Sequence, residues 1–275
     1  KHVIAQGASQ SAGRLGTYVN AIAPFNKTFD GFILSIYFGR GTPLQVGDEL
    51  VNINSSQYDD SPADKLRGTN LLRDDLEQPV FIVNSELEAI ACYGVRQPDT
   101  DKLRWWESAG TCHVSQQSRA ARRLMAERDL LLTPPAEDAI NAIPIGPLYD
   151  SAFYHMHQWL SGKIAPPVQP RIEFEGTPAS VIRDSDGIAK GGIRLPQVEA
   201  PLAVNSAVPL KPDIFAYLGG SSEPFSRAQV SARYSDRASF LQKFEDAAKT
   251  AVKEGILRPR DIERLTAEAK DTWPE

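Results

Sequence analysis

A serine between small residues is the feature of this sequence best suited to chemistry. Gly7-Ala8-Ser9-Gln10-Ser11 follows a short apolar stretch and precedes a segment with helical spacing of apolar residues. Such a turn projects a strained serine from the carboxyl edge of a sheet, and bulky side chains two positions before or after it would collide with the strand and the helix. Ser9 is therefore the candidate nucleophile, and the backbone N–H of Gln10 is the candidate oxyanion donor. Ser11 replaces the commoner glycine, which lowers the specificity of the motif.

A serine nucleophile needs a histidine to take its proton and an acid to orient that histidine. Where a turn of this kind is used, the chain order is serine, acid, histidine. The sequence supplies this order, because Glu86 and Glu88 follow one apolar stretch and His113 follows the next. His113 is preferred because His2 precedes the turn and the remaining two histidines fall inside a predicted helix. Glu86 and Glu88 are both candidates for the acid.

The elements that must position these residues alternate between strand and helix. Buried strands, each a short and almost continuously apolar run, are predicted at 2–7, 29–37, 79–84 and 103–108. Helices, each with apolar residues at helical spacing or with clear end signals, are predicted at 11–23, 115–132, 148–160, 238–255 and 259–270. This alternation predicts an α/β fold with a mostly parallel sheet flanked by helices.

Two stretches fall outside the alternation. Residues 42–78 are polar and long enough for a cap-like insertion of the kind that often covers active sites. After the proline pair at 166–167, a small β-rich accessory segment with a hairpin at 180–189 is expected. We therefore predict that residues 1–165 form the catalytic core, and that residues 166–275 add the accessory hairpin and C-terminal helices to the same domain.

Four stretches resemble motifs of a known family. Gly7–Ser11 resembles its G-x-S-Q-S elbow, Ser85–Glu88 its S-E-T-D acid loop, and Ala109–His113 its A-G-T-x-H histidine loop. Gly191–Pro201 resembles a late family signature. Over nearly its whole length, the chain resembles the C-terminal half of an α/β-hydrolase, from the nucleophile elbow onward, in the bacterial family of "alpha/beta hydrolase domain" proteins.

The resemblance implies a role for each candidate residue: Ser9 as nucleophile, Glu88 as triad acid where the family usually has Asp, and His113 as general base. The expected function is a cofactor-independent serine hydrolase that cleaves a small-molecule carboxylic ester through an acyl-enzyme. Amidases, lactonases and acyltransferases use the same groups, and the sequence does not identify the substrate. The competing hypothesis is a non-catalytic hydrolase-like scaffold, or a subunit completed by another chain.

An α/β-hydrolase builds several strands before its elbow, and one oxyanion amide comes from that earlier region. Here the elbow serine is residue 9, and a strand in a parallel sheet needs a neighbour on each side. The fold is therefore expected to be completed by an N-terminal polypeptide segment, either a separate product of processing or an upstream part of the chain.

Three further features have weaker interpretations. Arg40 closes a predicted strand and is a candidate for binding a substrate carboxylate, although a solvated loop arginine is the commoner case. Cys92 and Cys112 lie on loops expected to be neighbours, and are either a disulfide or two reduced thiols. Asp184–Gly187 resembles the start of a calcium loop but lacks the later ligands, so a hairpin turn is preferred and no metal is assigned.

Composition sets the broad class. With 275 residues, of which 41% are hydrophobic, the chain is long enough to bury a substantial core. Its net charge of −5 offers no basic face for nucleic acid, and no apolar run approaches the roughly 20 residues that a membrane helix needs. The first residues lack the layout of a signal peptide, and any export signal would lie upstream of them. We expect a soluble bacterial protein, either cytoplasmic or secreted, without membrane insertion.

Overall fold

The computed structural model describes residues 1–42, 45–46, 49–50, 68–131, 140–208 and 218–274. The chain forms two compact units. The first unit comprises Lys1–Asn84, Glu88–Glu107 and Ala152–Gln169, and the second unit comprises Ser85–Leu87, Ser108–Ser151 and Pro170–Glu275. The chain therefore passes between the units at the ends of two strands, within two helices and once after residue 169.

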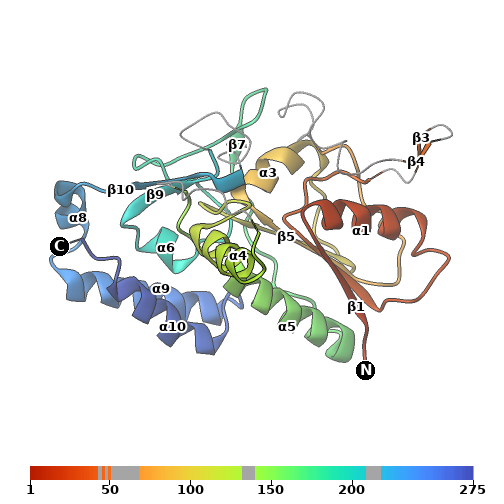
Figure 1. Cartoon of the computed structure of the whole chain (residues 1–275). Helices are drawn as coiled ribbons and strands as arrows, with labels where there is room; N and C mark the ends of the chain where they lie inside the picture. Colours follow the sequence, from red (N-terminus) through yellow and green to blue (C-terminus); the bar gives the residue numbers. More distant parts are fainter. Residues whose placement is uncertain (43–44, 47–48, 51–67, 132–139, 209–217, 275) are drawn as a thin grey trace. The chain divides into compact units, whose positions relative to one another are not determined.

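A four-stranded sheet with the order β1-β2-β5-β6 organises the first unit (Figure 1). Its strands are β1 (Ile4–Ala8), β2 (Gly31–Ser35), β5 (Val80–Ser85) and β6 (Leu103–Ser108). The β1–β2 and β2–β5 pairs are parallel. The N–H of Val80 donates to the carbonyl of Lys102, which joins the beginnings of β5 and β6. The predicted parallel sheet is confirmed, because all four strands end at one edge.

The near-continuous hydrophobicity of these strands reflects burial on both faces, since every residue of β2, β5 and β6 is buried. Helix α1 (Gln10–Ala21) covers one face, where a core cluster joins it to the sheet. That cluster includes Ala12, Val19, Phe32, Leu34, Val80, Ile82 and Trp105. Helix α1 and strand β1 therefore hold the turn between them against a packed core.

Trp105 and Trp106 face opposite sides of β6, as successive residues of a strand do. Trp105 belongs to the cluster under α1, whereas the ring of Trp106 packs edge-to-face on Phe81 at 4.9 Å and on His155 at 5.7 Å. His155 belongs to α5 (Gly146–Gly162), so the first-unit part of this helix covers the other face. The indole N–H of Trp106 donates to the carbonyl of Pro167 at 2.9 Å.

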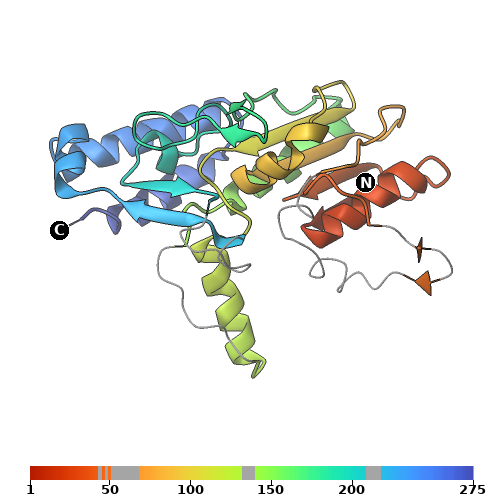
Figure 2. The same cartoon turned by 90° about the horizontal axis from the view of Figure 1, so that it is seen from above.

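The second unit consists mainly of helices and short antiparallel strands. Its elements include α4 (Gln116–Arg128), β7 (Phe174–Glu175), β8 (Ser180–Val181), α6 (Pro196–Glu199), β9 (Ala203–Ser206), β10 (Ser221–Pro224), α8 (Arg227–Arg233), α9 (Arg237–Lys253) and α10 (Pro259–Lys270). Helices α9 and α10 lie side by side (Figures 1 and 2). Their predicted bounds are confirmed within two residues, as is the glycine stop at Gly255, where φ is 76°.

The accessory hairpin is also confirmed. Arg183 and Ala189 form an antiparallel bridge, and the Asp184 side chain accepts hydrogen bonds from the N–H groups of Asp186 and Ile188. Gly187 has a φ of 84°, a left-handed conformation that glycine adopts without strain. The stretch Asp184–Gly187 is therefore a turn stabilised by its own aspartate.

The structure corrects several element predictions. The residues after β5, expected to be a loop, form α3 (Glu86–Cys92) and a 3₁₀ turn, Tyr93–Val95. Strand β2 ends at Ser35 rather than at residue 37, because Ile36 turns the backbone to a φ of 45°. Strands β9 and β10 were not predicted. Most of the proposed cap-like insertion at 42–78 lies outside the described residues, which show two short strands there, Gln45–Val46 and Glu49–Leu50.

Candidate active site

Ser9 occupies a strained turn between β1 and α1. Its φ of 58° and ψ of −122° lie outside the regions that L-residues ordinarily adopt, at a cost of about 1–3 kcal/mol. The Ser9 N–H donates to the carbonyl of Ser35 on β2 at 3.0 Å, and its carbonyl accepts from Gly13 of α1 at 3.1 Å. The surrounding strand and helix therefore hold the serine in this conformation, at the carboxyl edge of the sheet.

The small residue before this turn is sterically required. A Cβ placed on Gly7 would lie 2.5 Å from the carbonyl oxygen of Ser11 and 2.9 Å from the backbone nitrogen of Ala12. These are backbone atoms of the helix's first turn, so no rotamer change relieves the contact. Ser11 itself is exposed, which explains why its hydroxymethyl group fits where glycine is commoner. The sequence motif thus corresponds to a real close approach of strand and helix.

The loop after β2 is fastened to the end of β5. The buried side chain of Asn84 accepts from the N–H of Tyr37 at 2.8 Å and donates to its carbonyl at 2.9 Å. The thiol of Cys92, at the end of α3, donates to the same carbonyl at 3.0 Å. Burial raises the pKa of the Cys92 thiol, and nearby Glu88 and Glu107 raise it further, so this sulfur stays neutral. Neither cysteine forms a disulfide.

Glu86 and Glu88 lie on α3, and both are fully buried. On a continuing strand, two residues two positions apart would point the same way. Residues two apart on a helix are rotated by about 200°, so the side chains leave α3 on opposite sides. Glu88 belongs to the first unit, where its charge acts on Cys92 one helical turn away. Glu86 belongs to the second unit.

Glu86 is saturated with hydrogen-bond donors. Its Oε2 accepts from the N–H of Gly110 at 2.7 Å. Its Oε1 accepts from the guanidinium of Arg183 at 2.5 Å, from the N–H of Ala207 at 3.3 Å and from the hydroxyl of Ser206 at 3.5 Å. A buried carboxylate needs such donors, because burial removes the water that would otherwise bind its oxygens. Glu86 thus joins the histidine loop to the accessory hairpin.

The loop that carries His113 follows β6 and is held by buried polar groups. Gly110 has a φ of 68°, and its carbonyl accepts from the side chain of Asn141 at 2.7 Å. The hydroxyl of Thr111 donates to the carbonyl of Ser108, and the N–H of Val114 donates to the carbonyl of Leu218. His113 is only 8% exposed, which excludes the simple alternative of a solvated loop histidine.

The structure distributes the candidate residues over the two units. Ser9, Gln10 and Glu88 lie in the first unit, and His113 and Glu86 lie in the second. Within the first unit, the strands that precede the serine, the acid and the histidine all end at the same sheet edge.

Arg40, the candidate substrate-binding residue, is half-buried in the loop after β2. Its carbonyl oxygen lies 2.9 Å from a Cβ built on Gly13 of α1. Its backbone therefore packs closely against that helix.

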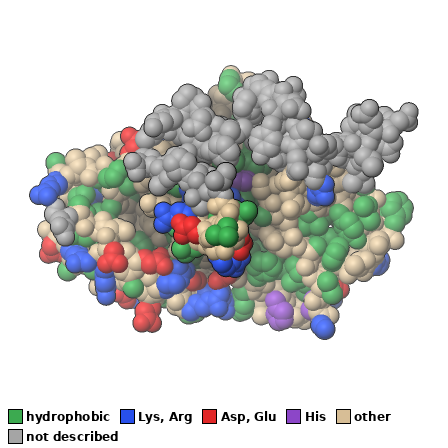
Figure 3. Space-filling model, viewed as in Figure 1, with side chains coloured by type: hydrophobic (Ala, Val, Ile, Leu, Met, Phe, Trp, Pro, Cys, Tyr) green, Lys and Arg blue, Asp and Glu red, His purple; other side chains and the backbone are tan. Residues whose placement is uncertain are grey.

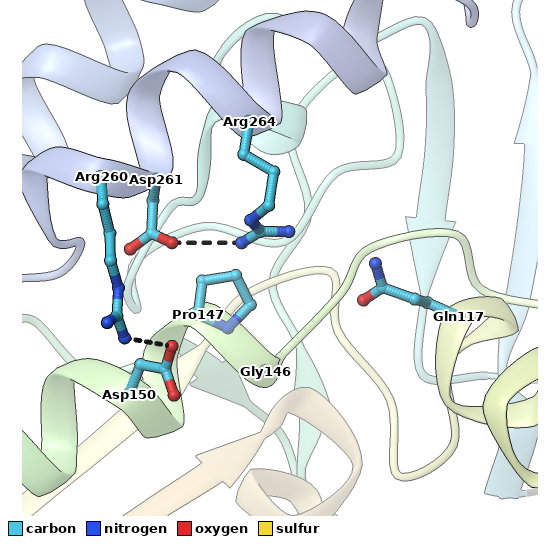
Figure 4. A pocket seen from close by; sticks show the side chains of 7 residues that line it. All are labelled: Gln117, Gly146, Pro147, Asp150, Arg260, Asp261 and Arg264. Atoms are coloured by element: carbon cyan, nitrogen blue, oxygen red, sulfur yellow. Dashed lines mark hydrogen bonds and ion pairs between the residues drawn. The ribbon is translucent and has the colours of Figure 1, made fainter.

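An open pocket of about 440 Å³ lies in the second unit, and none of the candidate catalytic residues is among those that line it (Figure 4). Residues from α4, α5 and α10 line it: Gln117, Gly146, Pro147, Asp150, Arg260, Asp261 and Arg264. Arg260 pairs with Asp150 at 2.8 Å, and Arg264 pairs with Asp261 at 3.1 Å. Because each guanidinium already faces a carboxylate, the pocket offers no net charge to an anionic ligand.

Comparison with known families decides the classification. The model of the family described as "Alpha/beta hydrolase domain" matches residues 1–267. The chain belongs to this alpha/beta hydrolase family. Its α/β fold with a parallel sheet and its small-x-Ser-x-small elbow agree with that membership, which indicates a hydrolase. Searches of curated proteins and of solved structures found no match.

The described residues contain neither a membrane-spanning helix nor a cluster of metal-binding side chains. None of their helices has the length and apolar character needed to cross a bilayer. Among the same residues, no three His, Cys, Asp or Glu side chains gather as a metal site would require. The calcium-loop interpretation of Asp184–Gly187 thus gains no further acidic ligand from the described parts of the chain.

Proposed function

We propose that this family member is a serine hydrolase that cleaves a carboxylic ester through an acyl-enzyme, with Ser9, His113 and Glu88 as its triad. The observation that carries the proposal is the backbone of Ser9. This non-glycine residue, at φ 58° and ψ −122°, is held in a strained conformation by the strand and the helix on either side of it. Such strain is expected where a side chain must project from a sheet edge toward a substrate.

In the proposed reaction, His113 takes the proton of the Ser9 hydroxyl as its oxygen attacks the ester carbonyl. The N–H of Gln10, in the first turn of α1, donates to the developing oxyanion at the positive end of the helix. The carbon–oxygen bond to the alcohol then breaks, and the alcohol leaves with the proton from His113. Water, deprotonated by His113, attacks the acyl group and restores Ser9.

The hydrogen bonds that Glu86 makes disfavour it as the triad acid. Both oxygens of Glu86 already accept strong donors, including the guanidinium of Arg183, so this carboxylate serves the loop backbone rather than an imidazole. Glu88 is equally buried and leaves α3 on the other side. Its strand, β5, lies between β2 and the strand that leads to the histidine loop.

The open side of β1 supports the expected partner segment. In the described part of the chain, β1 has a sheet neighbour on one side only, namely β2. Green apolar side chains gather over the part of the first unit that β1 and α1 occupy (Figure 3). We propose that a further strand, from a polypeptide segment outside residues 1–275, pairs with β1 and supplies the second oxyanion amide. Loss of one such donor costs roughly 10²- to 10³-fold in kcat.

Labelling with a fluorophosphonate tests the proposal. The native protein is expected to gain one phosphonyl adduct by intact mass spectrometry, and the S9A variant none. Ser161→Ala is the matched control, because the Ser161 hydroxyl lies 3.5 Å from the ring nitrogen of His157 but at an exposed position on α5, without an elbow. S161A should label like the native protein. An unlabelled native protein would favour the hydrolase-like scaffold instead.

A further inference from the structure

We propose that Arg183 and Glu86 are positioning residues for His113, so that the accessory hairpin sets the geometry of the catalytic histidine. This inference rests on the proposed serine-hydrolase function. It assigns a task to the hairpin, which lies some 70 residues beyond His113 in the chain and has no other evident link to catalysis.

The contacts form a continuous path within the second unit. One guanidinium nitrogen of Arg183 donates to Glu86 Oε1 at 2.5 Å and to the hydroxyl of Ser206 at 3.0 Å. The other donates to the carbonyl of Gly187, in the hairpin's own turn, at 3.2 Å. On the far side of the carboxylate, Glu86 Oε2 accepts from the N–H of Gly110. The hairpin and the histidine loop thus share one anion.

Gly110 is the point at which the histidine loop is fixed. Glu86 holds its N–H and Asn141 holds its carbonyl, both at 2.7 Å. The Asn141 side chain also donates to the carbonyl of Ser206 at 3.2 Å, which closes the network on the strand that contacts Arg183. Gly110 adopts a φ of 68° and lies three residues before His113. Both peptide groups of this turn are therefore oriented by buried side chains.

A buried ion pair is a costly way to stabilise a fold, because desolvation of the two charges offsets much of their attraction. Glu86 is fully buried and the Arg183 side chain is only 24% exposed. A neutral side chain in place of Glu86 could equally accept the hydrogen bond from the N–H of Gly110. We therefore ascribe the charged pair to the need for one precise conformation of the histidine loop. Misplacement of a catalytic group by 1 Å costs about 10²-fold in rate.

The test compares Arg183→Met with Arg264→Met. Both variants leave a buried carboxylate without its guanidinium, Glu86 in one case and Asp261, only 2% exposed, in the other. The Asp261–Arg264 pair is drawn in Figure 4, and its described hydrogen bonds are confined to α10 and the residue just before it, Arg258. R183M should therefore slow phosphonylation of Ser9 by about 10- to 100-fold, whereas R264M should leave this rate unchanged.

Two further measurements separate positioning from simple destabilisation. Turnover of p-nitrophenyl acetate by R183M should show a reduced kcat with KM unchanged, and Arg183→Lys should recover part of the rate by restoring one charged donor. Hydrogen exchange of a peptide covering residues 109–113 should be faster in R183M and unchanged in R264M. If R183M does not fold, the same measurements on R183K test the positioning role.

The outcomes distinguish a failure of the positioning role from a failure of the proposed serine-hydrolase function. If native Ser9 is never labelled, the proposed function fails, and hydrogen exchange alone then decides whether the pair holds the loop. If native Ser9 is labelled and R183M labels equally fast, the positioning role is wrong. The role is also wrong if R183M labels slowly while exchange at 109–113 stays at the native rate.

Discussion

The tight contact at Gly7 allows the effect of one added methyl group to be estimated. In Gly7→Ala, the new Cβ would lie 2.5 Å from the carbonyl oxygen of Ser11, about 1 Å inside ordinary van der Waals contact. The obstructing atoms belong to the helix backbone, so either α1 or the turn must move. Overpacking of this kind costs about 1–3 kcal/mol, which corresponds to a Tm lower by roughly 2–12 °C. A 1 Å displacement of Ser9 would slow its reaction by about 10²-fold.

The assay measures the rate of Ser9 phosphonylation under conditions where the variant is folded, together with the Tm by calorimetry. Gly94→Ala is the matched control, because a Cβ on Gly94 meets no atom within 4 Å. G94A should keep the native labelling rate and lose no stability beyond a few tenths of a kcal/mol. If G7A labelled at the native rate and unfolded at the native temperature, the elbow would not depend on this contact and the reasoning would be refuted.

Two other predictions concern buried titratable groups. Glu88→Gln should reduce ester turnover by about 10²- to 10⁴-fold, because an amide cannot stabilise the imidazolium. Glu86→Gln should lower the Tm and reduce turnover less, by about 10- to 100-fold, because it disturbs only the loop that holds His113; a larger loss in E86Q than in E88Q would make Glu86 the acid. Burial, followed by the charge of Cys92, raises the pKa of Tyr37, so the unfolded chain releases this proton more readily and stability falls as the pH rises above roughly 10. The free energy of unfolding, measured in urea at pH 9 and 11, should fall less in Tyr37→Phe than in the native protein. An equal fall in the two proteins would contradict this prediction.

Strong local signals made much of the first unit predictable. Strands β2, β5 and β6 are buried on both faces, so their sequences are almost continuously apolar and their positions could be inferred directly. The turn at Ser9 was predictable because a close approach between strand and helix selects a small residue at Gly7. The C-terminal helices were predictable from amphipathic spacing and from the signals at Gly255 and Pro259.

Elements fixed by distant partners were not predictable. Helix α3 begins Glu86-Leu87-Glu88. Charged residues are seldom buried without a partner, so this sequence is typical of an exposed loop. Glu86 is buried because Arg183 meets it from 97 positions away, and no local pattern contains that information. Strands β9 and β10 are short and polar, and they form only because each supplies the other's hydrogen bonds. The left-handed backbone of Ser9 likewise arises from the packed elements around it.

The central claim is that Ser9 is a nucleophile, and locating the adduct tests it most directly. Trypsin is expected to release residues 2–14, which contain only two serines, Ser9 and Ser11. After treatment of the native protein with a fluorophosphonate, fragmentation of this peptide by tandem mass spectrometry should place the whole adduct on Ser9. An adduct on Ser11 or elsewhere, or no adduct on a folded native protein, would contradict the account.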